Sequence, residues 1–324
     1  MNEDKQQPTR RSSLSFWGLL EAASIVMCAA TLIGFLSRLW WVFELTSHFR
    51  LHLAVALGSL TMIWLARRRW LIAAISAGAA LVNLFPVLTV YLPGEALEAN
   101  NGAKVRLVSL NVHTENENNG LVLKFLENTD ADVILLMEVD KAWIDALQPL
   151  RTNYSHVVAE PREDNFGIAL FSRLPLTNSG VLEFGEAEVP SIRATMSVGK
   201  QLCVLLGTHP LPPGSSEYAR LRNEQFGKIC TWVHDQNLPV VVLGDLNCTP
   251  WSPYFADLLR NGGLKNVSPK AGLYGSWPAW LPLFRIPLDH CLVSTNICII
   301  SKRMGPQVGS DHLPLEIELQ LPSD

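Results

Sequence analysis

Three long apolar stretches dominate the first 92 residues and constrain this chain more than any other feature. They cover residues 16–36, 49–66 and 70–92. A helix needs about 20 residues to cross the hydrocarbon core of a bilayer, so the first and third stretches are long enough and the second is marginal. None of them has the polar face of a helix at a protein surface. We therefore predict three transmembrane helices over residues 16–92, preceded by a polar tail at 1–15.

Three other interpretations of these stretches agree less well with the residues. A bundle inside a water-soluble protein would still need polar outer faces. A cleavable signal at the first stretch would show a clear cleavage pattern and would leave two further apolar stretches to explain. A transporter or channel would carry ionisable side chains along its path, whereas polar residues in the stretches are few, among them Glu21, Ser24, Thr31 and Asn83. The stretches therefore predict a membrane anchor.

Basic residues in the short loops predict an orientation for this anchor. Three of them precede the first apolar stretch, and three more fill the turn between the second and third. These six are Lys5, Arg10, Arg11 and Arg67 to Arg69, and the four left on the other side are Arg38, Arg50, Lys104 and Arg106. The positive-inside rule then favours a cytoplasmic N-terminus and, after three crossings, a periplasmic or extracellular C-terminal domain. If the second stretch does not cross, this prediction reverses.

The C-terminal part of the chain has the opposite charge balance. Residues 1–94 carry eight Lys and Arg against four Asp and Glu, whereas residues 95–324 carry eighteen against twenty-six. A protein that grips long duplex nucleic acid by charge needs a surface rich in Lys and Arg. The acidic C-terminal part argues against electrostatic binding of long duplex nucleic acid, although it does not exclude a local basic groove.

The cysteines indicate neither a zinc site nor a redox motif. The chain has six of them, with no CxxC pair and no cluster of cysteine and histidine at zinc-binding spacing. They are best interpreted as buried apolar residues. Cys291 and Cys298 could form a disulfide in an oxidising compartment, and the sequence leaves this open.

Residues 93–103 form a polar linker, and residues 104–324 are enough for one domain with a substantial core. The segment 104–113 first alternates between polar and apolar residues and then becomes apolar, and this pattern predicts the first strand. A helix is predicted at 140–150. Further strands follow closely between 155 and 208, the last of them at 201–208, and a long amphipathic helix is predicted at 216–236. Strand runs with intervening helices are typical of two sheets that pack face to face with helices outside. The predicted fold class is α/β.

Eight polar side chains lie at or near the ends of predicted strands in this domain. Loops at strand ends are where a rigid scaffold presents catalytic groups, so these residues are the candidates for chemistry. They are Asn111, Glu138, His209, Asp245, Asn247, Asp289, Asp311 and His312.

Residue type indicates what several of these side chains can do. Glu138 follows a run of apolar residues, and it is either a surface cap or a ligand for a hard cation such as Mg²⁺. In the segment GDLN, Asp245 can orient or deprotonate a water and Asn247 can donate to a phosphate oxygen, although a plain turn has the same sequence. His312, beside Asp311, can act as a general base if another carboxylate fixes its tautomer.

Taken together, in this order and on this strand pattern, the eight residues resemble the endonuclease/exonuclease/phosphatase family. This family includes pancreatic-type deoxyribonucleases, abasic-site endonucleases, neutral sphingomyelinases and inositol-polyphosphate phosphatases. The resemblance covers roughly residues 105–319 and is closest to a bacterial membrane-associated branch. The segments that carry it read NFGIALFSRLPL, YARLRNEQF, GDLNCTPWSP, RIPLDHCLVS and GSDHLPLEIEL.

The resemblance implies a four-layered α/β/β/α sandwich and a divalent cation, Mg²⁺ or Mn²⁺, as cofactor. It places Asn111 and Glu138 at the metal site, with Glu138 as the main protein ligand and Asp311 as a further carboxylate. The implied substrate is a phosphoester of a nucleic acid, a lipid headgroup or a small molecule. No feature of the sequence indicates an obligate protein partner.

For the chemistry, the resemblance implies in-line attack of water on phosphorus. Asp245 would orient or activate the water or assist the leaving group, and Asn247 would hold the phosphate. His209 would donate to a phosphate oxygen or to the leaving group. Asp289 and His312 would form an imidazole–carboxylate pair. Branches of the family differ in the general base, so that role stays shared between Asp245 and His312.

Some neighbouring residues are better explained by structure than by function. His113 and His290 lie beside candidate residues but are interpreted as structural. Trp251, Trp277 and Trp280 could line a substrate groove, although scattered tryptophans are by default part of the core. No basic, aromatic-rich insertion is evident, which puts duplex DNA in doubt as a substrate. The alternative function is a catalytically silent membrane receptor or scaffold that retains the fold. Such a protein is free to lose some of the eight residues, and none is missing.

Overall fold

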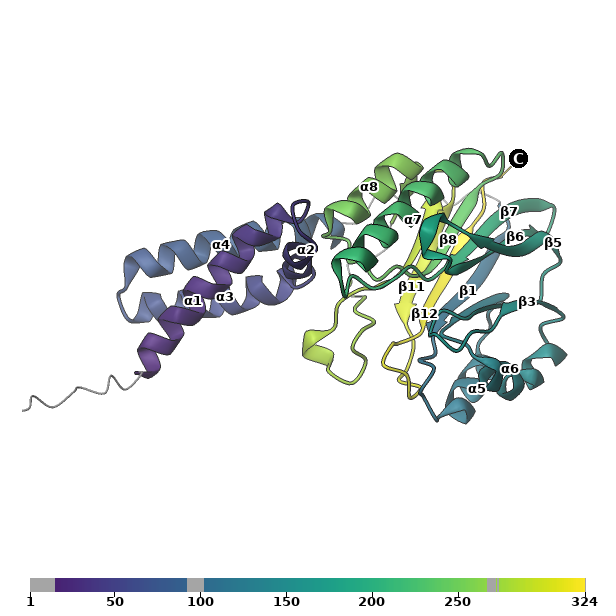
Figure 1. The fold of residues 1–324 in the computed structure, drawn as a ribbon, viewed down its shortest axis with the longest axis horizontal. Coiled ribbons are helices and arrows are strands. Elements are labelled where there is room, and N and C mark those ends of the chain that lie inside the picture. Colours follow the sequence, from purple (N-terminus) through teal and green to yellow (C-terminus); the bar gives the residue numbers. More distant parts are fainter. Residues whose placement is uncertain (1–14, 92–101, 267–271, 273, 324) are drawn as a thin grey trace, which may run out of the picture.

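The computed structural model describes residues 15–91, 102–266, 272 and 274–323. The expected tail at 1–15 and linker at 93–103 lie almost entirely outside these ranges. The described chain forms a helical bundle that projects from one end of a larger α/β body (Figure 1).

Four helices and one short 3-10 turn make up the projecting bundle. They are α1 (Phe16–Ile33), η1 (Gly34–Leu36), α2 (Trp41–Ser47), α3 (Arg50–Ala66) and α4 (Trp70–Tyr91). The segments Phe16–Leu36 and Trp70–Val90 have 21 residues each and are apolar enough to cross a membrane. A third span exists only if α2 and α3 are counted as one, and these helices meet at a bend of 62°. The expectation of three spans is therefore met for two helices and depends on a bent pair for the third.

The few polar residues of the bundle hold its helices together. Trp64 of α3 donates to Ser24 of α1 at 2.9 Å, and Asn83 of α4 donates to Thr31 of α1 at 2.7 Å. Interhelical hydrogen bonds of this kind stabilise helix packing in an apolar surrounding. These side chains therefore contribute to the packing of the bundle.

The α/β body contains two six-stranded sheets. The first has the order β11 (Cys298–Met304), β12 (Leu315–Gln320), β1 (Lys104–Asn111), β2 (Val133–Met137), β4 (Ile168–Ser172) and β3 (His156–Glu160). The second has the order β5 (Leu176–Glu183), β6 (Pro190–Val198), β7 (Gln201–Thr208), β8 (Val240–Asp245), β10 (Asp289–Ser294) and β9 (Leu264–Lys265). Among the strands that the structure describes, only the pairs β1–β2 and β7–β8 are parallel.

The two sheets pack face to face, and helices cover their outer faces. Helices α5 (Asn119–Asn128) and α6 (Lys141–Ala146) lie on the first sheet, and α7 (Ser216–His234) and α8 (Pro253–Gly262) lie on the second. Strand β2 is apolar throughout because alternate side chains serve two cores. Leu135 packs between the sheets, whereas its neighbours on the strand pack under α5 and α6. The predicted four-layered α/β/β/α sandwich is confirmed.

All six cysteines lie within the described ranges, and none of them is disulfide-bonded. Cys291 is fully buried between the two sheets, and Cys298 is only partly buried. The expectation that the cysteines serve mainly as apolar core residues holds for the four that are buried in the sandwich.

Candidate active site

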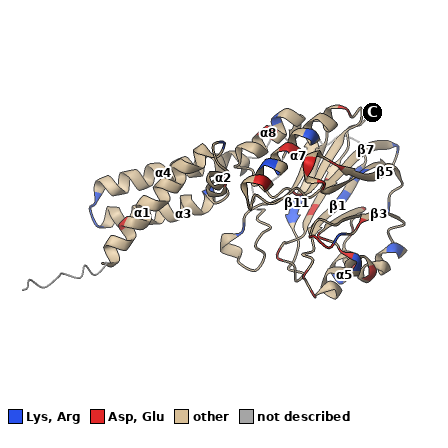
Figure 2. Ribbon diagram, viewed as in Figure 1, with Lys and Arg blue, Asp and Glu red and all other residues tan. Residues whose placement is uncertain are grey.

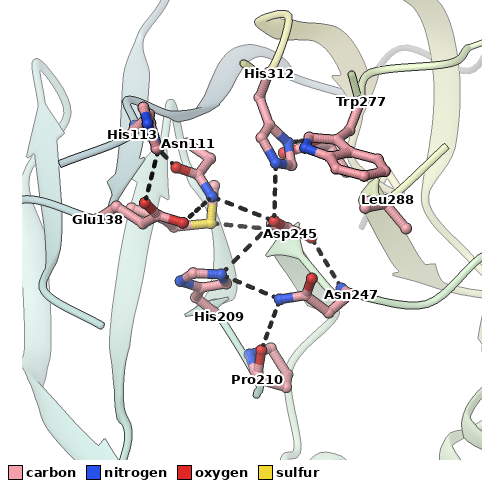
Figure 3. Close-up of polar contacts among 12 residues, drawn as sticks. Asn111, His113, Glu138, His209, Pro210, Asp245, Asn247, Trp277, Leu288 and His312 are labelled. Carbon is pink, nitrogen blue, oxygen red and sulfur yellow. Dashed lines mark hydrogen bonds and ion pairs between the residues drawn. The ribbon is translucent and has the colours of Figure 1, made fainter. Parts of the chain in front are cut away.

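Strand register brings the candidate residues to one edge of the sandwich. Asn111, the last residue of β1, is level with Met137 on the parallel strand β2, so Glu138 follows one residue beyond it. In the other sheet, Asp245 at the end of β8 is directly opposite Asp289 at the start of β10. The two sheets therefore present carboxylates and amides to the same cleft (Figure 3).

Asp245 lies at the centre of this cleft. Its Oδ2 lies 3.6 Å from Nε2 of His209 and 3.5 Å from Nε2 of His312, and it accepts a hydrogen bond from Asn111 at 3.3 Å. The preceding residue is Gly244, with a φ of +144°. A Cβ there would lie 2.0 Å from the carbonyl oxygen of Thr208. Only glycine allows this close approach of β8, which sets the position of Asp245.

Asp289 orients the imidazole of His312. Nδ1 of His312 donates to Oδ2 of Asp289 at 2.8 Å, and both side chains are buried. Burial by itself would lower the pKa of His312, but the charges of Asp289 and Asp245, the hydrogen bond to Asp289 and the charge of Asp311 raise it to about 10. The same geometry leaves Nε2 of His312 directed at Asp245.

Glu138 lies on the opposite side of the cleft with a backbone φ of +60°. Its Oε1 accepts a hydrogen bond from Asn111 at 2.8 Å, and its Oε2 lies 3.6 Å from Nδ1 of His113. The same nitrogen of His113 lies 3.7 Å from Oδ1 of Asp311. Two carboxylates and an amide thus face one small region at the end of the first sheet.

The donor chemistry of this region fits Mg²⁺ or Mn²⁺. Such hard cations take oxygen ligands and are bound through one or two carboxylates, with water and substrate phosphate completing the shell. Glu138, Asp311 and the amide oxygen of Asn111 are ligands of that type. Among the described residues, no group of three or more His, Cys, Asp or Glu side chains is arranged to hold a metal by itself, so a cation here would rely on water and substrate.

Asn247 and His209 form the floor of the cleft next to Asp245. The backbone N–H of Asn247 donates to Oδ1 of Asp245 at 2.9 Å, and its side-chain amide donates to the carbonyl of Pro210 at 3.0 Å. The same amide nitrogen lies 3.2 Å from Nε2 of His209. The ring of Phe166 covers His209 at 5.5 Å between centroids. The amide and the imidazole therefore share one fixed position beside the central carboxylate.

Two residues that the sequence favoured as structural also face the site. His113, interpreted as structural, bridges the region between Glu138 and Asp311. Its place in the loop directly after β1, the strand that ends at Asn111, was the available signal. Trp277, assigned by default to the core, lines the cleft and donates to Oδ2 of Asp311 at 3.0 Å. His290 is buried away from the cleft against Phe255, as the sequence suggested.

The cleft has a volume of about 790 Å³ and is open to solvent. Strand ends of both sheets form its polar end. Side chains from the helical bundle line part of its wall, together with loops of the α/β body. Its size is that of a small-molecule or headgroup site.

The fold and this site define a class of protein: a two-sheet α/β/β/α sandwich that presents carboxylates, imidazoles and amides to a single cleft. A model of the endonuclease/exonuclease/phosphatase family matches residues 108–312. The chain belongs to this family, which indicates a phosphoester hydrolase, since its members are mostly metal-dependent enzymes of that kind. No curated protein matches the sequence.

Several solved structures share the fold. The human nocturnin catalytic domain with bound sulfate is 20% identical, over 68% of this chain and 96% of that chain, with a TM-score of 0.56. D. rerio TDP2 complexed with single strand DNA product is 14% identical, over 67% and 99%, with a TM-score of 0.56. Sphingomyelinase C from Streptomyces griseocarneus is 18% identical, over 66% and 99%, with a TM-score of 0.51. At these identities the likeness shows the fold alone.

Proposed function

We propose that this chain is a membrane-anchored, divalent-metal-dependent hydrolase of phosphoester bonds. The observation that carries the proposal is the position of Asp245. It lies between the imidazoles of His209 and His312, in the same cleft as the metal-site candidate Glu138. A phosphate held there would meet hydrogen-bond donors on one side and an oxygen-rich cation site on the other.

Glu138, Asn111 and Asp311 would hold the cation, which when bound neutralises charge that develops on the phosphate oxygens. The other residues of the cleft bind the ester and move protons. Asp245 orients a water and accepts its proton as the new P–O bond forms and the ester P–O bond breaks. Asp289 holds Nδ1 of His312, so Nε2 faces the cleft, where it can donate to a phosphate or leaving-group oxygen.

Asn247 and His209 would fix the phosphate for this attack. The amide of Asn247 is a neutral donor held by its own backbone contact with Asp245, so it can turn from Pro210 to a phosphate oxygen with little rearrangement. His209 lies within reach of the same oxygen. Donors positioned in advance at a point of developing charge are a main source of rate enhancement.

Metal removal should abolish the activity. With the full chain purified in detergent, we expect hydrolysis of methyl p-nitrophenyl phosphate to stop with chelator and to return with Mg²⁺ or Mn²⁺. The full chain is required, because α2 of the bundle lines the cleft. The variant Glu138→Gln should need a higher Mg²⁺ concentration. Hydrolysis that continues in chelator would contradict the metal assignment.

We further propose that the catalytic domain lies outside the cytoplasm. The start of α1 and the turn with Arg67 to Arg69 lie at the end of the bundle far from the α/β body (Figure 2). Arg67 stacks on Trp17, and Arg69 pairs with Glu21 at 3.3 Å. The positive-inside rule favours a cytoplasmic location for this basic end. A periplasmic reporter enzyme fused to the C-terminus should therefore be active, and a signal from a cytoplasmic reporter there would reverse the orientation.

A further inference from the structure

The membrane-side helix α2 forms part of the wall of the catalytic cleft. Trp41 and Leu45 of α2 and the following Phe49 line the same cleft as Asp245 and Asn247. In Figure 1, α2 lies where the bundle meets the α/β body. The polar end of the cleft thus continues into an apolar wall that belongs to the bundle.

A buried ion pair fixes α2 to the α/β body. Oε2 of Glu44 accepts a hydrogen bond from Arg222 of α7 at 2.6 Å, and both side chains are fully buried. Ser252 donates to Oε1 of the same carboxylate at 2.7 Å. Arg222 also donates to the backbone carbonyl of Asn247 at 3.3 Å. The apolar wall is therefore held in a constant position relative to the residue proposed to bind phosphate.

The α/β body adds apolar side chains to the same cleft. Phe166, Ile286 and Leu288 line it. Nearby in the sequence, the segment 280–284 exposes four large apolar side chains: Trp280 at 68%, Leu281 at 36%, Leu283 at 85% and Phe284 at 51%. The ring of Phe284 stacks on His52 of α3 at 5.7 Å. This exposed apolar segment therefore adjoins the helical bundle.

The described residues that line the cleft include no Lys and no Arg. A site that binds a polyanionic strand needs such cations along the backbone. The lack of Lys and Arg among these lining residues, together with the apolar side chains of the cleft, favours a substrate with one phosphoester group and a hydrocarbon part.

We propose that the substrate is an amphiphilic phosphoester taken from the bilayer in which the bundle is embedded. Its phosphate would lie at Asp245 and Asn247, and its hydrocarbon chain would lie along Trp41, Leu45 and Phe49. This inference rests on the proposed phosphoester hydrolysis and adds the substrate class. The bundle then has two roles, because it anchors the enzyme and contributes the apolar half of its binding site.

Two probes with the same scissile bond test this proposal. They are methyl p-nitrophenyl phosphate and hexadecyl p-nitrophenyl phosphate, offered with Mg²⁺ to the full chain in the same mixed micelles. Loss of apolar contact equivalent to two methylene groups corresponds to about a tenfold change. We expect Leu45→Gln to lower kcat/KM for the hexadecyl ester about tenfold more than for the methyl ester. Phe49→Gln should shift the ratio of kcat/KM for the hexadecyl ester to kcat/KM for the methyl ester in the same direction.

A matched control and the remaining outcomes make the test decisive. Leu121→Gln changes an exposed leucine of α5, outside the cleft, and should leave both rates unchanged. Two outcomes would overturn the proposal. One is that both cleft variants hydrolyse both esters at the wild-type rate, and the other is that they lose the same fold of activity on the two esters. If wild-type protein hydrolyses neither ester, the proposed function itself fails, which is a distinguishable result.

Discussion

Replacing His312 with alanine is expected to lower kcat for methyl p-nitrophenyl phosphate by about 100- to 10,000-fold, the usual range for a positioned acid–base group. The imidazole is held between Asp289 and Asp245, so no neighbouring side chain replaces its proton. Steady-state kinetics on the purified full chain measures the effect. The domain should stay folded, because three extensive apolar clusters of the sandwich are untouched.

A second variant and a control separate chemistry from structure at this position. His312→Gln keeps a donor toward Asp289, so it should retain more stability than alanine while losing as much activity. His234→Ala removes an exposed histidine at the end of α7 and should have no effect on turnover. Turnover of His312→Gln within a few fold of wild type would remove His312 from the mechanism.

Replacing Glu44 with glutamine should have the largest effect on stability. It leaves Arg222 buried without its counter-charge, and breaking a buried pair by removing one partner costs about 3–5 kcal/mol. Release of α2 from the body would expose Arg222 to water and limit this cost. We therefore expect a lower Tm in detergent together with faster proteolysis of the segment around α2.

A paired substitution tests whether the unpaired buried charge causes the lower Tm. Replacing both partners, with Glu44→Leu and Arg222→Met, removes both buried charges and should recover much of the lost Tm. The substitution Leu121→Gln at an exposed position of α5 serves as a control for nonspecific effects of detergent. An unchanged Tm and unchanged proteolysis of Glu44→Gln would show that α2 is not held by this pair.

Local sequence patterns predicted most of the sandwich. The strand expected at 201–208 is β7 with the same bounds, and the helix expected at 216–236 is α7, shorter by two residues. The helix expected at 140–150 instead divides into α6 and the 3-10 turn at 148–152. Pro149 lies in this turn, where it lacks an N–H to continue an α-helix. Strand β9 was missed because its two residues have no periodicity.

Helix α2 could not be predicted from local pattern. It has only seven residues, and an isolated helix of that length is marginal in water. Its stability comes from tertiary contacts, above all the pair between Glu44 and Arg222, which are 178 positions apart. No local rule connects two such residues. The apolar wall of the cleft was missed for the same reason.

The candidate site was easier to predict than its surroundings. Strand register brings Asn111, Glu138, Asp245 and Asp289 to one edge of the sandwich. Loops bring the other four to the same cleft: His209, Asn247, Asp311 and His312. Their roles remain predictions. The position of His113 depends on a backbone φ of +60° just beyond β1, which sequence does not specify for a histidine.

The central claim is that this cleft directs water to phosphorus with the help of a divalent cation. The most direct measurement is hydrolysis of methyl p-nitrophenyl phosphate by the full chain, with Mg²⁺, in water enriched in heavy oxygen. Mass spectrometry of the products should find the label in methyl phosphate and none in p-nitrophenol. Label in p-nitrophenol, or release of p-nitrophenol that does not depend on Mg²⁺, would contradict the account.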